Sequence, residues 1–398
     1  MRNYPKFYLT SKGEKFLRTG HVWCFSDEVT RVEGEYKNGD IVDVLSPKGK
    51  YLGSGFVNDH SKIRVRIIST NTNDKFDAAF WQRRVRYALE YRRQVLREDF
   101  SSCRLIFGEA DGFPGLTVDR FGAVLVAQVL SLGTEQRQEV IFQALLDELP
   151  DIKGIYLRND VKIRKLEGLE QFTGWYHKDA DWECTVMEIT ENGIRYKVDF
   201  AQGQKTGFFL DQKYNRQAVA RLAKGRRVLD CFTHTGSFAL NAAKGGAARV
   251  VAVDISADAL EMAKENAKLN GLQIETLEAN VFDLLTKLEE EHNKDFDFII
   301  LDPPAFTKSG ATVSAAIRGY KEINYRAMKL LPRGGYLATC SCSHFMKEEF
   351  FIEMLKDASR DACVSLRQIE ARQQGPDHPI LWNVPETNYL KFYLFQVI

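Results

Sequence analysis

The 398-residue sequence contains no run of 18 apolar residues, so we predict no helix that spans a membrane. Its first 15 residues, MRNYPKFYLTSKGEK, lack an apolar core, which argues against a secretory signal. Cysteine is scarce, and the seven cysteines are scattered and odd in number, which favours reduced thiols over a disulfide framework. We therefore expect a cytoplasmic protein.

Two phosphate-binding motifs are also missing from Arg227 to Asp254, the stretch around which the chain is organised. Its loop is not G-x-G-x-x-G and carries no Lys-Ser/Thr pair, which argues against a dinucleotide site and against a P-loop. The stretch contains a strand that ends on Asp230 and a loop of small and hydroxyl residues with Gly236 at its turn. A helix and a second strand ending on Asp254 follow.

The acid at the end of each strand points to a nucleoside ligand. In an open parallel sheet, ligands bind in the crevice outside the carboxyl ends of the strands. Asp254 follows Asp230 by 24 residues, about the spacing at which an acid takes both hydroxyls of a ribose. Gly236 lets the backbone approach a ligand closely. A nucleoside with little or no phosphate fits this loop, and S-adenosylmethionine is the common one. The alternative is an ordinary βαβ unit with charged strand ends.

Residues 1–72 are predicted to form a small β domain with a basic surface. Short apolar runs alternate there with turn sequences such as Lys37-Asn38-Gly39-Asp40. Residues 1–100 hold 19 Lys and Arg against 13 Asp and Glu, a balance that suits a polyanion such as RNA. The alternative is a solvated rim around a core tryptophan, Trp23. The candidate RNA-binding residues are Lys12, Arg18, His21, Arg64 and Arg66.

Residues 73–184 predict a self-contained α+β unit without evident catalytic residues. A basic helix over Phe76 to Asp99 opens it, and strands follow within Cys103 to Val118 and at Val124 to Leu130. Apolar residues recur at a helical period from Thr134 to Leu149, which predicts one amphipathic helix there.

Residues 185–398 predict a doubly wound α/β sheet. An Asn-Gly pair at residues 192–193 indicates a hairpin. The loop Gln202 to Asp211 precedes a helix and is either a cover over the ligand or a plain connection. Asn280-Val281-Phe282-Asp283 is predicted to close the third strand, with polar groups and a ring suited to an adenine.

The ends of the next two strands carry further reactive groups. The fourth strand ends in Asp302-Pro303-Pro304, and the fifth leads into Cys340-Ser341-Cys342-Ser343-His344. If the fifth strand continues that far, Cys340 and Cys342 point to the same face, so spacing alone does not choose between them. Both thiols are alternatively structural. A metal site with His344 is disfavoured because no second cluster has zinc-ligand spacing.

These motifs look like those of a class I methyltransferase that acts on nucleic acid. The run Arg104-Leu105, then Glu109 to Phe121 (EADGFPGLTVDRF), then Gly203 to Asp211 (GQKTGFFLD), resembles the ribosomal RNA large-subunit methyltransferase I family. The resemblance covers essentially the whole chain. It implies a PUA RNA-binding domain over residues 1–72, an α+β linker domain over 73–184 and a Rossmann-like methyltransferase domain over 185–398.

The resemblance also implies an activity: methyl transfer from S-adenosylmethionine to carbon 5 of a cytosine in 23S ribosomal RNA. The implied partner is the large-subunit RNA, and the sequence is compatible with a homodimer without proving one. The residues that we assign to the cofactor are Lys205, Thr206, Gly207, Phe209, Asp230, Phe232, Thr233, Thr235, Gly236, Asp254, Ile255, Asn280, Phe282, Asp283 and Asp302.

Cytosine carbon 5 is a poor nucleophile, and a covalent route solves this: a thiolate adds to carbon 6 and sends electron density to carbon 5. By resemblance, Cys342 is the nucleophile and Asp302 is the partner of the ring nitrogen. The family pattern Ser-Cys-Ser favours Cys342 over Cys340.

One position departs from the pattern of many cytosine-5 RNA enzymes. They carry a second cysteine just after the fourth-strand motif, where this chain has Ala305, so the base that removes the carbon-5 proton is unassigned. The Asp-Pro-Pro form also occurs in enzymes that methylate nitrogen. N-methylation of a guanine without a covalent intermediate is therefore the enzymatic alternative. A non-catalytic RNA-binding protein with the same fold is the other.

Overall fold

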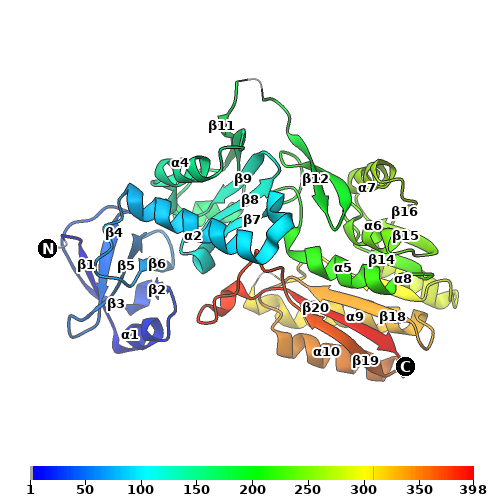
Figure 1. Cartoon of the computed structure of the whole chain (residues 1–398). Coiled ribbons are helices and arrows are strands. Elements are labelled where there is room, and N and C mark those ends of the chain that lie inside the picture. The colour runs from blue at the N-terminus through cyan, green and yellow to red at the C-terminus, as the bar shows by residue number, and fades with distance from the viewer. Residues whose placement is uncertain (1–2, 181, 308) are drawn as a thin grey trace. The chain divides into compact units, whose positions relative to one another are not determined.

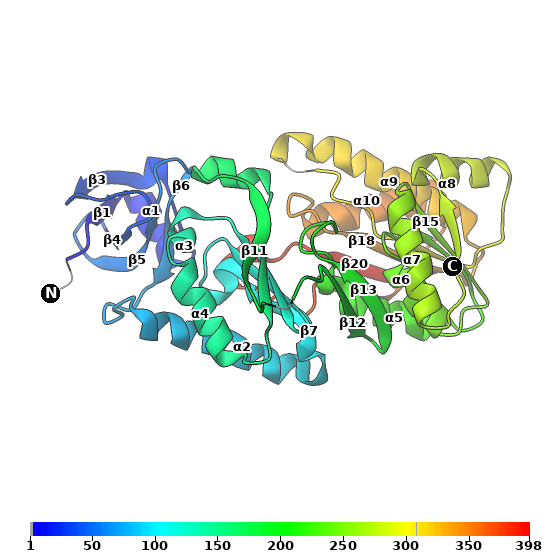
Figure 2. The same cartoon turned by 90° about the horizontal axis from the view of Figure 1, so that it is seen from above.

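The computed structural model describes residues 3–180, 182–307 and 309–398, and the chain divides into two compact units (Figure 1, Figure 2). The first unit consists of Met1–Ile189, Val198–Leu210 and Pro376–Thr387. The second consists of Thr190–Lys197, Asp211–Gly375 and Asn388–Ile398. Within the described ranges, no helix combines the length and the apolar composition needed to cross a membrane.

The first unit opens with a six-stranded sheet in the order β2-β6-β5-β4-β1-β3. Its strands are β1 (Lys6–Leu9), β2 (Trp23–Phe25), β3 (Val29–Glu33), β4 (Ile41–Leu45), β5 (Tyr51–Val57) and β6 (Ile63–Ser69). This sheet confirms the predicted small β domain. Helix α1 (Ser11–Arg18) was not predicted. It begins where the Thr10 hydroxyl accepts a hydrogen bond from the amide of Gly13 over 3.1 Å.

A second sheet of the first unit has the order β11-β10-β9-β8-β7. Its strands are β7 (Ser102–Phe107), β8 (Leu116–Phe121), β9 (Val124–Val129), β10 (Gly154–Asn159) and β11 (Phe172–Lys178). Helices α2 (Ala78–Leu96), α3 (Leu132–Glu135) and α4 (Gln138–Glu148) accompany it. The single helix predicted from Thr134 was wrong at its start, because α3 ends at Glu135 and α4 begins only at Gln138. Strand β11 was not predicted.

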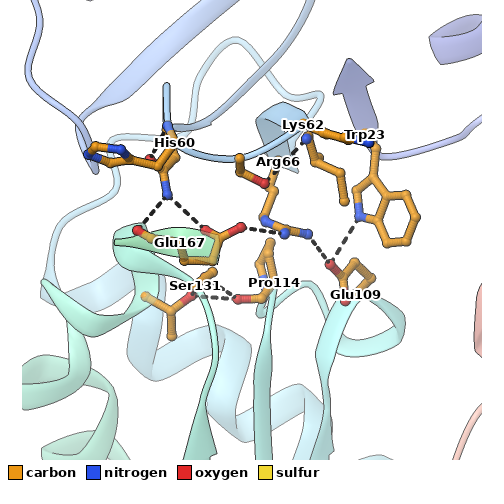
Figure 3. Close-up of polar contacts among 12 residues, drawn as sticks. Trp23, His60, Lys62, Arg66, Glu109, Pro114, Ser131 and Glu167 are labelled. Carbon is orange, nitrogen blue, oxygen red and sulfur yellow. Dashed lines mark hydrogen bonds and ion pairs between the residues drawn. The ribbon is translucent and has the colours of Figure 1, made fainter. Parts of the chain in front are cut away.

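A cluster of polar side chains joins the two sheets of the first unit. Figure 3 shows Arg66 of β6 pointing between Glu109 and Glu167, with ion pairs of 3.3 Å and 2.9 Å. The indole of Trp23 donates to Glu109 over 3.0 Å, and the Asn58 amide donates to Glu167 over 2.9 Å. Because these charges are largely buried, their geometry fixes the small β domain on the sheet that follows it.

A two-stranded hairpin, β12 (Val186–Glu191) and β13 (Ile194–Asp199), follows in the chain. Asn192 and Gly193 have φ angles of 54° and 70°. Two successive positive φ angles are those of the turn that an Asn-Gly pair favours, so the predicted hairpin is present.

The second unit contains a seven-stranded sheet in the order β16-β15-β14-β17-β18-β20-β19. Its strands are β14 (Arg227–Cys231), β15 (Arg249–Asp254), β16 (Glu275–Glu278), β17 (Phe298–Leu301), β18 (Tyr336–Ser341), β19 (Leu366–Arg372) and β20 (Lys391–Val397). The strands β14 to β18 pair in parallel, while β20 is antiparallel to both of its neighbours. The predicted α/β sheet is confirmed, although β19 was not predicted.

Helices cover both faces of this sheet (Figure 2). They are α5 (Lys213–Leu222), α6 (Ser237–Lys244), α7 (Ala257–Leu269), α8 (Val281–Glu290), α9 (Val313–Leu330) and α10 (Glu348–Asp361). One apolar core includes Leu229 and Ile299 with residues of α9 and α10, and the other includes Val228 and Ile300 with residues of α5 and α6. Alternate residues of each strand therefore serve opposite faces.

One expectation in this unit was wrong. Residues 280–283 do not close the third strand, because β16 ends at Glu278 and Asn280 instead caps helix α8. The Asn280 side chain accepts a hydrogen bond from the amide of Phe282 over 2.9 Å, a strong signal for a helix start.

Candidate cofactor and catalytic site

The carboxyl ends of the parallel strands bring the predicted acids to one edge of the seven-stranded sheet. Cys231 of β14 is aligned with Val253 of β15 on one side and with Leu301 of β17 on the other. Asp254 and Asp302 are the next residues along those two neighbouring strands. The crevice outside such strand ends is where α/β sheets bind ligands.

The loop after β14 follows a tight path that requires glycine. Gly236 has a φ of +83°, and a Cβ atom there would lie 2.8 Å from the Cβ of Ala263. His234 also has a positive φ, 52°, and its backbone amide donates to Oδ2 of Asp254 over 2.8 Å. The loop is thereby tied to the end of β15.

Asp254 presents an oriented carboxylate. Its Oδ1 accepts a hydrogen bond from the amide of Ser256 over 3.0 Å, so each oxygen has one backbone donor. The side chain is partly exposed, and each oxygen keeps lone-pair capacity for a hydroxyl. The next residue, Ile255, is 71% exposed, so its apolar side chain is available to a ligand.

Asp230 is fully buried, and Oδ1 of its carboxyl has no hydrogen-bond partner among the described residues. The other oxygen accepts from the Thr233 hydroxyl over 2.5 Å and from the amide of Ala239 over 2.9 Å. Burial, followed by the charges of Asp302 and Asp254, raises the pKa of Asp230 to about 7, although the two hydrogen bonds oppose the shift. An unpartnered buried acceptor of this kind fits a ligand donor.

Aromatic rings lie beside the first turn of α8. The Phe282 ring centroid is 5.7 Å from that of Phe306, which is in turn 6.4 Å from Phe232 and 4.6 Å from Tyr320. Phe282 and Phe232 are half-buried, while Asn280 is exposed. This arrangement offers the flat apolar surface that a purine needs.

Of the other predicted residues near these strands, Asp283 is exposed on α8 and Thr235 is half-buried in the loop. The Thr235 carbonyl accepts a hydrogen bond from the amide of Asn266 over 3.4 Å.

Asp302 is held by a glutamine that we did not predict. The Gln212 amide donates to Oδ1 of Asp302 over 2.9 Å. Burial, followed by the charge of Asp211, raises the pKa of Asp302 to about 6, while Arg216, Cys340 and Gln212 act in the opposite direction. The carboxyl therefore takes up a proton at a mildly acidic pH.

The two cysteines near Asp302 have different environments. Strand β18 ends at Ser341, so it includes Cys340 and stops one residue short of Cys342, where the sequence left its extent open. Cys340 is fully buried in one of the apolar cores. Burial, followed by the charge of Asp302, raises the pKa of Cys340 well above its usual value. Cys342 is only partly buried, and its Sγ lies 4.0 Å from the carbonyl oxygen of Pro303. Accessibility thus favours Cys342 as the reactive thiol.

Comparison with known proteins identifies this arrangement. The S-adenosylmethionine-dependent methyltransferase family matches residues 174–396, and a PUA-like domain matches residues 7–70. Over 96% of this chain and 97% of its own length, the Aeromonas salmonicida protein ribosomal RNA large subunit methyltransferase I is 43% identical. The Klebsiella pneumoniae protein of the same name is 40% identical over 99% of both chains.

The chain belongs to the ribosomal RNA large subunit methyltransferase I family. Two solved structures share its fold: a candidate SAM-dependent methyltransferase from Streptococcus mutans and a candidate methyltransferase crystallised with SAH. Their TM-scores are 0.83 and 0.84 at 21% identity, over 98% of this chain and 99% of each of theirs.

The cofactor of this methyltransferase I family member is S-adenosylmethionine, as predicted. The site fits it on chemical grounds: Asp254 offers acceptors for hydroxyls, the Phe282 region offers an apolar surface, and Asp230 offers a buried acceptor.

The 205–209 loop of this family member lies in the first unit, whereas the other cofactor candidates lie in the second. Thr206 is buried, and its hydroxyl donates to Asp119 over 2.6 Å. Lys205 places its ammonium 4.8 Å from the centroid of the Phe209 ring, and Gly207 has a φ of +118°. A cofactor role for these four residues stays a prediction.

The five candidate RNA-binding residues have different surroundings. Lys12 and Arg18 are exposed on α1, although Arg18 pairs with Glu14 over 2.8 Å. Arg64 pairs with Asp59 over 2.9 Å and keeps some exposure. Arg66 and His21 are engaged within the protein, since Arg66 holds the cluster of Figure 3.

His21 is 5% exposed and lies 3.2 Å from a carboxylate oxygen of Glu386. We therefore keep Lys12, Arg18 and Arg64 as RNA-contact candidates in this methyltransferase I family member.

Three functional candidates were missed in the sequence. The roles of Gln212 and Lys391 depend on hydrogen bonds to residues that are distant in the chain. Trp382 is 92% exposed, and its neighbour Asn383 lies against Gly20 beside the end of α1. An aromatic residue this exposed is unusual, but a lone tryptophan in a sequence gives no sign of its exposure.

Proposed function

We propose that this protein transfers a methyl group from S-adenosylmethionine to carbon 5 of a cytosine in large-subunit (23S) ribosomal RNA through a covalent bond to Cys342. The observation that carries the proposal is that a partly exposed thiol and a carboxyl that can hold a proton lie at the ends of neighbouring strands. Cys342 follows β18 and Asp302 follows the adjacent strand β17. The names of the relatives support the choice of RNA.

The chemistry assigns one task to each group. The Cys342 thiolate adds to carbon 6, and the electron pair of the 5,6 double bond moves to carbon 5. When bound, S-adenosylmethionine supplies the methyl group that carbon 5 accepts. Loss of the carbon-5 proton then restores the double bond as the carbon–sulfur bond breaks and its electron pair returns to sulfur.

Asp302 is the proposed hydrogen-bond partner of the cytosine ring nitrogen. Addition at carbon 6 builds negative charge on nitrogen 3, and a protonated carboxyl can donate to that atom. A carboxyl with a pKa of about 6 carries its proton far more often near neutral pH than an ordinary aspartic acid does. The same property makes Asp302 a better partner for the substrate ring than for the cofactor.

The RNA surface lies on the first unit. Helix α1 exposes Lys12 and Arg18, and the exposed ring of Trp382 lies next to Asn383, which contacts Gly20 at the end of this helix. Cations that attract the phosphates, together with an aromatic ring that stacks on a base, are the combination used by single-stranded RNA sites. The PUA-like match over residues 7–70, which include helix α1, supports the part of this assignment that concerns Lys12 and Arg18.

The deciding experiment is methyl transfer from labelled S-adenosylmethionine to large-subunit RNA transcribed in vitro, with the product nucleoside identified by mass spectrometry. We expect 5-methylcytosine. A methylated guanine would replace the covalent route by nitrogen methylation, for which the Asp302-Pro303-Pro304 motif is the supporting observation. If no methyl group were transferred, large-subunit RNA would be refuted as the substrate. The domain boundaries, the cytoplasmic location and a homodimer stay predictions.

A further inference from the structure

Lys391 is a buried lysine whose ammonium makes no direct ion pair with a carboxylate among the described residues. It is 6% exposed, and its ammonium donates to the carbonyl oxygens of Ser343 over 2.6 Å and of Tyr389 over 2.8 Å. An ammonium removed from water without a paired anion costs several kcal/mol. Two carbonyls compensate only part of that cost, so the position needs another explanation.

The lysine lies at the strand end that carries the reactive thiol. Strand β20 is antiparallel to β18, and Lys391, its first residue, is aligned with Ser341, the last residue of β18. Cys342 is the next residue, and Ser343, which accepts the hydrogen bond, follows it. The ammonium therefore binds the backbone one residue beyond Cys342, close enough for the charge of a Cys342 thiolate to act on it.

Titratable groups of the described residues face this pair from several elements. From α10, Glu348 accepts a hydrogen bond from the Tyr393 hydroxyl over 2.7 Å. From α9, the Tyr320 hydroxyl accepts one from Ser341 over 3.0 Å. Asp302 lies beyond β17 and Cys340 is fully buried on β18.

Burial lowers the pKa of Lys391 to about 8, and the negative charges that Cys342 and Glu348 can carry act in the opposite direction. A free thiol has a pKa of about 8.5, and a cationic neighbour lowers the pKa of a thiol.

We propose that Lys391 is the positioning residue for the nucleophile: its amine takes the proton of the Cys342 thiol, and the resulting ammonium holds the thiolate. The S–H bond breaks as an N–H bond forms, so a neutral pair becomes an ammonium–thiolate pair. After the methylated base leaves, the electron pair returns to sulfur and the ion pair is restored. This inference rests on the proposed covalent function and adds the group that activates its thiol.

The test is the rate at which iodoacetamide alkylates Cys342 in the full-length protein between pH 5.5 and 9.5. Tandem mass spectrometry separates Cys342 from the other six cysteines, because fragment ions cleaved between Cys340 and Cys342 distinguish these two thiols of one tryptic peptide. Wild type, K391M and K391R are compared, and affinity for S-adenosylhomocysteine serves as the check on folding. We expect the pH at which the wild-type alkylation rate is half-maximal (the midpoint) to lie at least about one pH unit below the pKa of a free thiol.

In K391M the midpoint should rise by about one unit, which slows alkylation at pH 7 about tenfold. K391R keeps the positive charge and should restore the low midpoint. A purely structural lysine would leave the midpoint in K391M unchanged, and that result would overturn the proposal.

If K391M does not fold, a wild-type midpoint at or above about 8.5 overturns it equally. The proposed function is tested by a different result. A methylguanine product would refute cytosine methylation, and if the alkylation midpoint still rose in K391M, the inference about Lys391 and Cys342 would stand.

Discussion

Gln212 donates from Nε2 to Oδ1 of Asp302 over 2.9 Å, and its own Oε1 accepts from Asn215 over 2.6 Å. Asn215 in turn accepts from the Arg372 guanidinium over 3.2 Å. Because the Gln212 amide is held at both ends, it cannot rotate without breaking two hydrogen bonds. A chain of polar side chains thus fixes the direction in which the Asp302 carboxyl points.

Replacement of Gln212 by Leu should therefore reduce kcat by roughly 10- to 100-fold, since Asp302 loses its orientation. The KM for S-adenosylmethionine should change little. The measurement is steady-state methyl transfer, and Gln217→Leu, at an exposed position of helix α5, which Gln212 immediately precedes, is the matched control. Equal effects of the two changes would contradict a positioning role.

Cys342→Ala should abolish turnover and leave the affinity for S-adenosylhomocysteine within a few-fold. Cys340→Ala should instead lower stability by about 1 kcal/mol, because this buried thiol fills space in the core, and should retain measurable turnover although Cys340 also acts on the Asp302 carboxyl. RNA containing 5-fluorocytosine should trap a covalent adduct with wild type and with Cys340→Ala, visible on a denaturing gel. An adduct with Cys342→Ala would reassign the nucleophile.

The affinity for S-adenosylhomocysteine should rise as pH increases through 7. Asp230 is protonated below its pKa of about 7, and a ligand donor prefers the ionised carboxylate, so binding improves as the proton is lost. Between pH 6 and pH 8 the gain should be about tenfold by calorimetry. Asp230→Asn should flatten this dependence, while Asp295→Asn, at an exposed carboxyl outside the cofactor candidates, should keep it.

Asp254→Ala should weaken cofactor binding by about 2 kcal/mol, since two hydroxyls lose a charged acceptor. Asp258→Ala, four residues later on the exposed face of α7, is the control and should bind normally. Isothermal titration calorimetry of S-adenosylhomocysteine measures both. Unchanged affinity in Asp254→Ala would mean that the ribose is bound elsewhere.

Trp382→Ala should weaken RNA binding by about 1–3 kcal/mol, the usual loss for one stacked base. Trp382→Phe should recover part of it, and cofactor affinity should not change. Fluorescence anisotropy with a labelled single-stranded fragment of the large-subunit RNA gives the comparison. Tyr87→Ala, at an aromatic residue that is 61% exposed on α2, controls for the loss of any surface ring.

The sequence was most informative where local chemistry decides the structure. The order of strand, loop and helix around Gly236 could be predicted because a glycine turn and apolar strands are local signals. Helix α1 was not predicted because a short helix that contains Gly13 has a weak intrinsic helix propensity. The Asn280 segment was misassigned because the same Asn that closes a strand also starts a helix.

The candidate site was predictable only in part for a different reason. Asp254 and Cys342 stand at strand ends, and strand ends can be read from apolar runs. Gln212 and Lys391, by contrast, meet their partners across 90 and 48 residues of chain, and no local pattern encodes such a pairing. Exposure of Trp382 likewise depends on how the whole chain packs.

The two compact units are interleaved along the chain, and this has a consequence for any attempt to separate them. Residues 376–387 return to the first unit after most of the second has been made, and there Asp377 receives hydrogen bonds from Arg92 and from the amide of Arg104. No single cut of the gene yields either unit intact. A ribosome that has synthesised only the first 375 residues holds a first unit whose buried Arg92 still lacks one of its acceptors, so that unit can be completed only after residues 376–387 have been made.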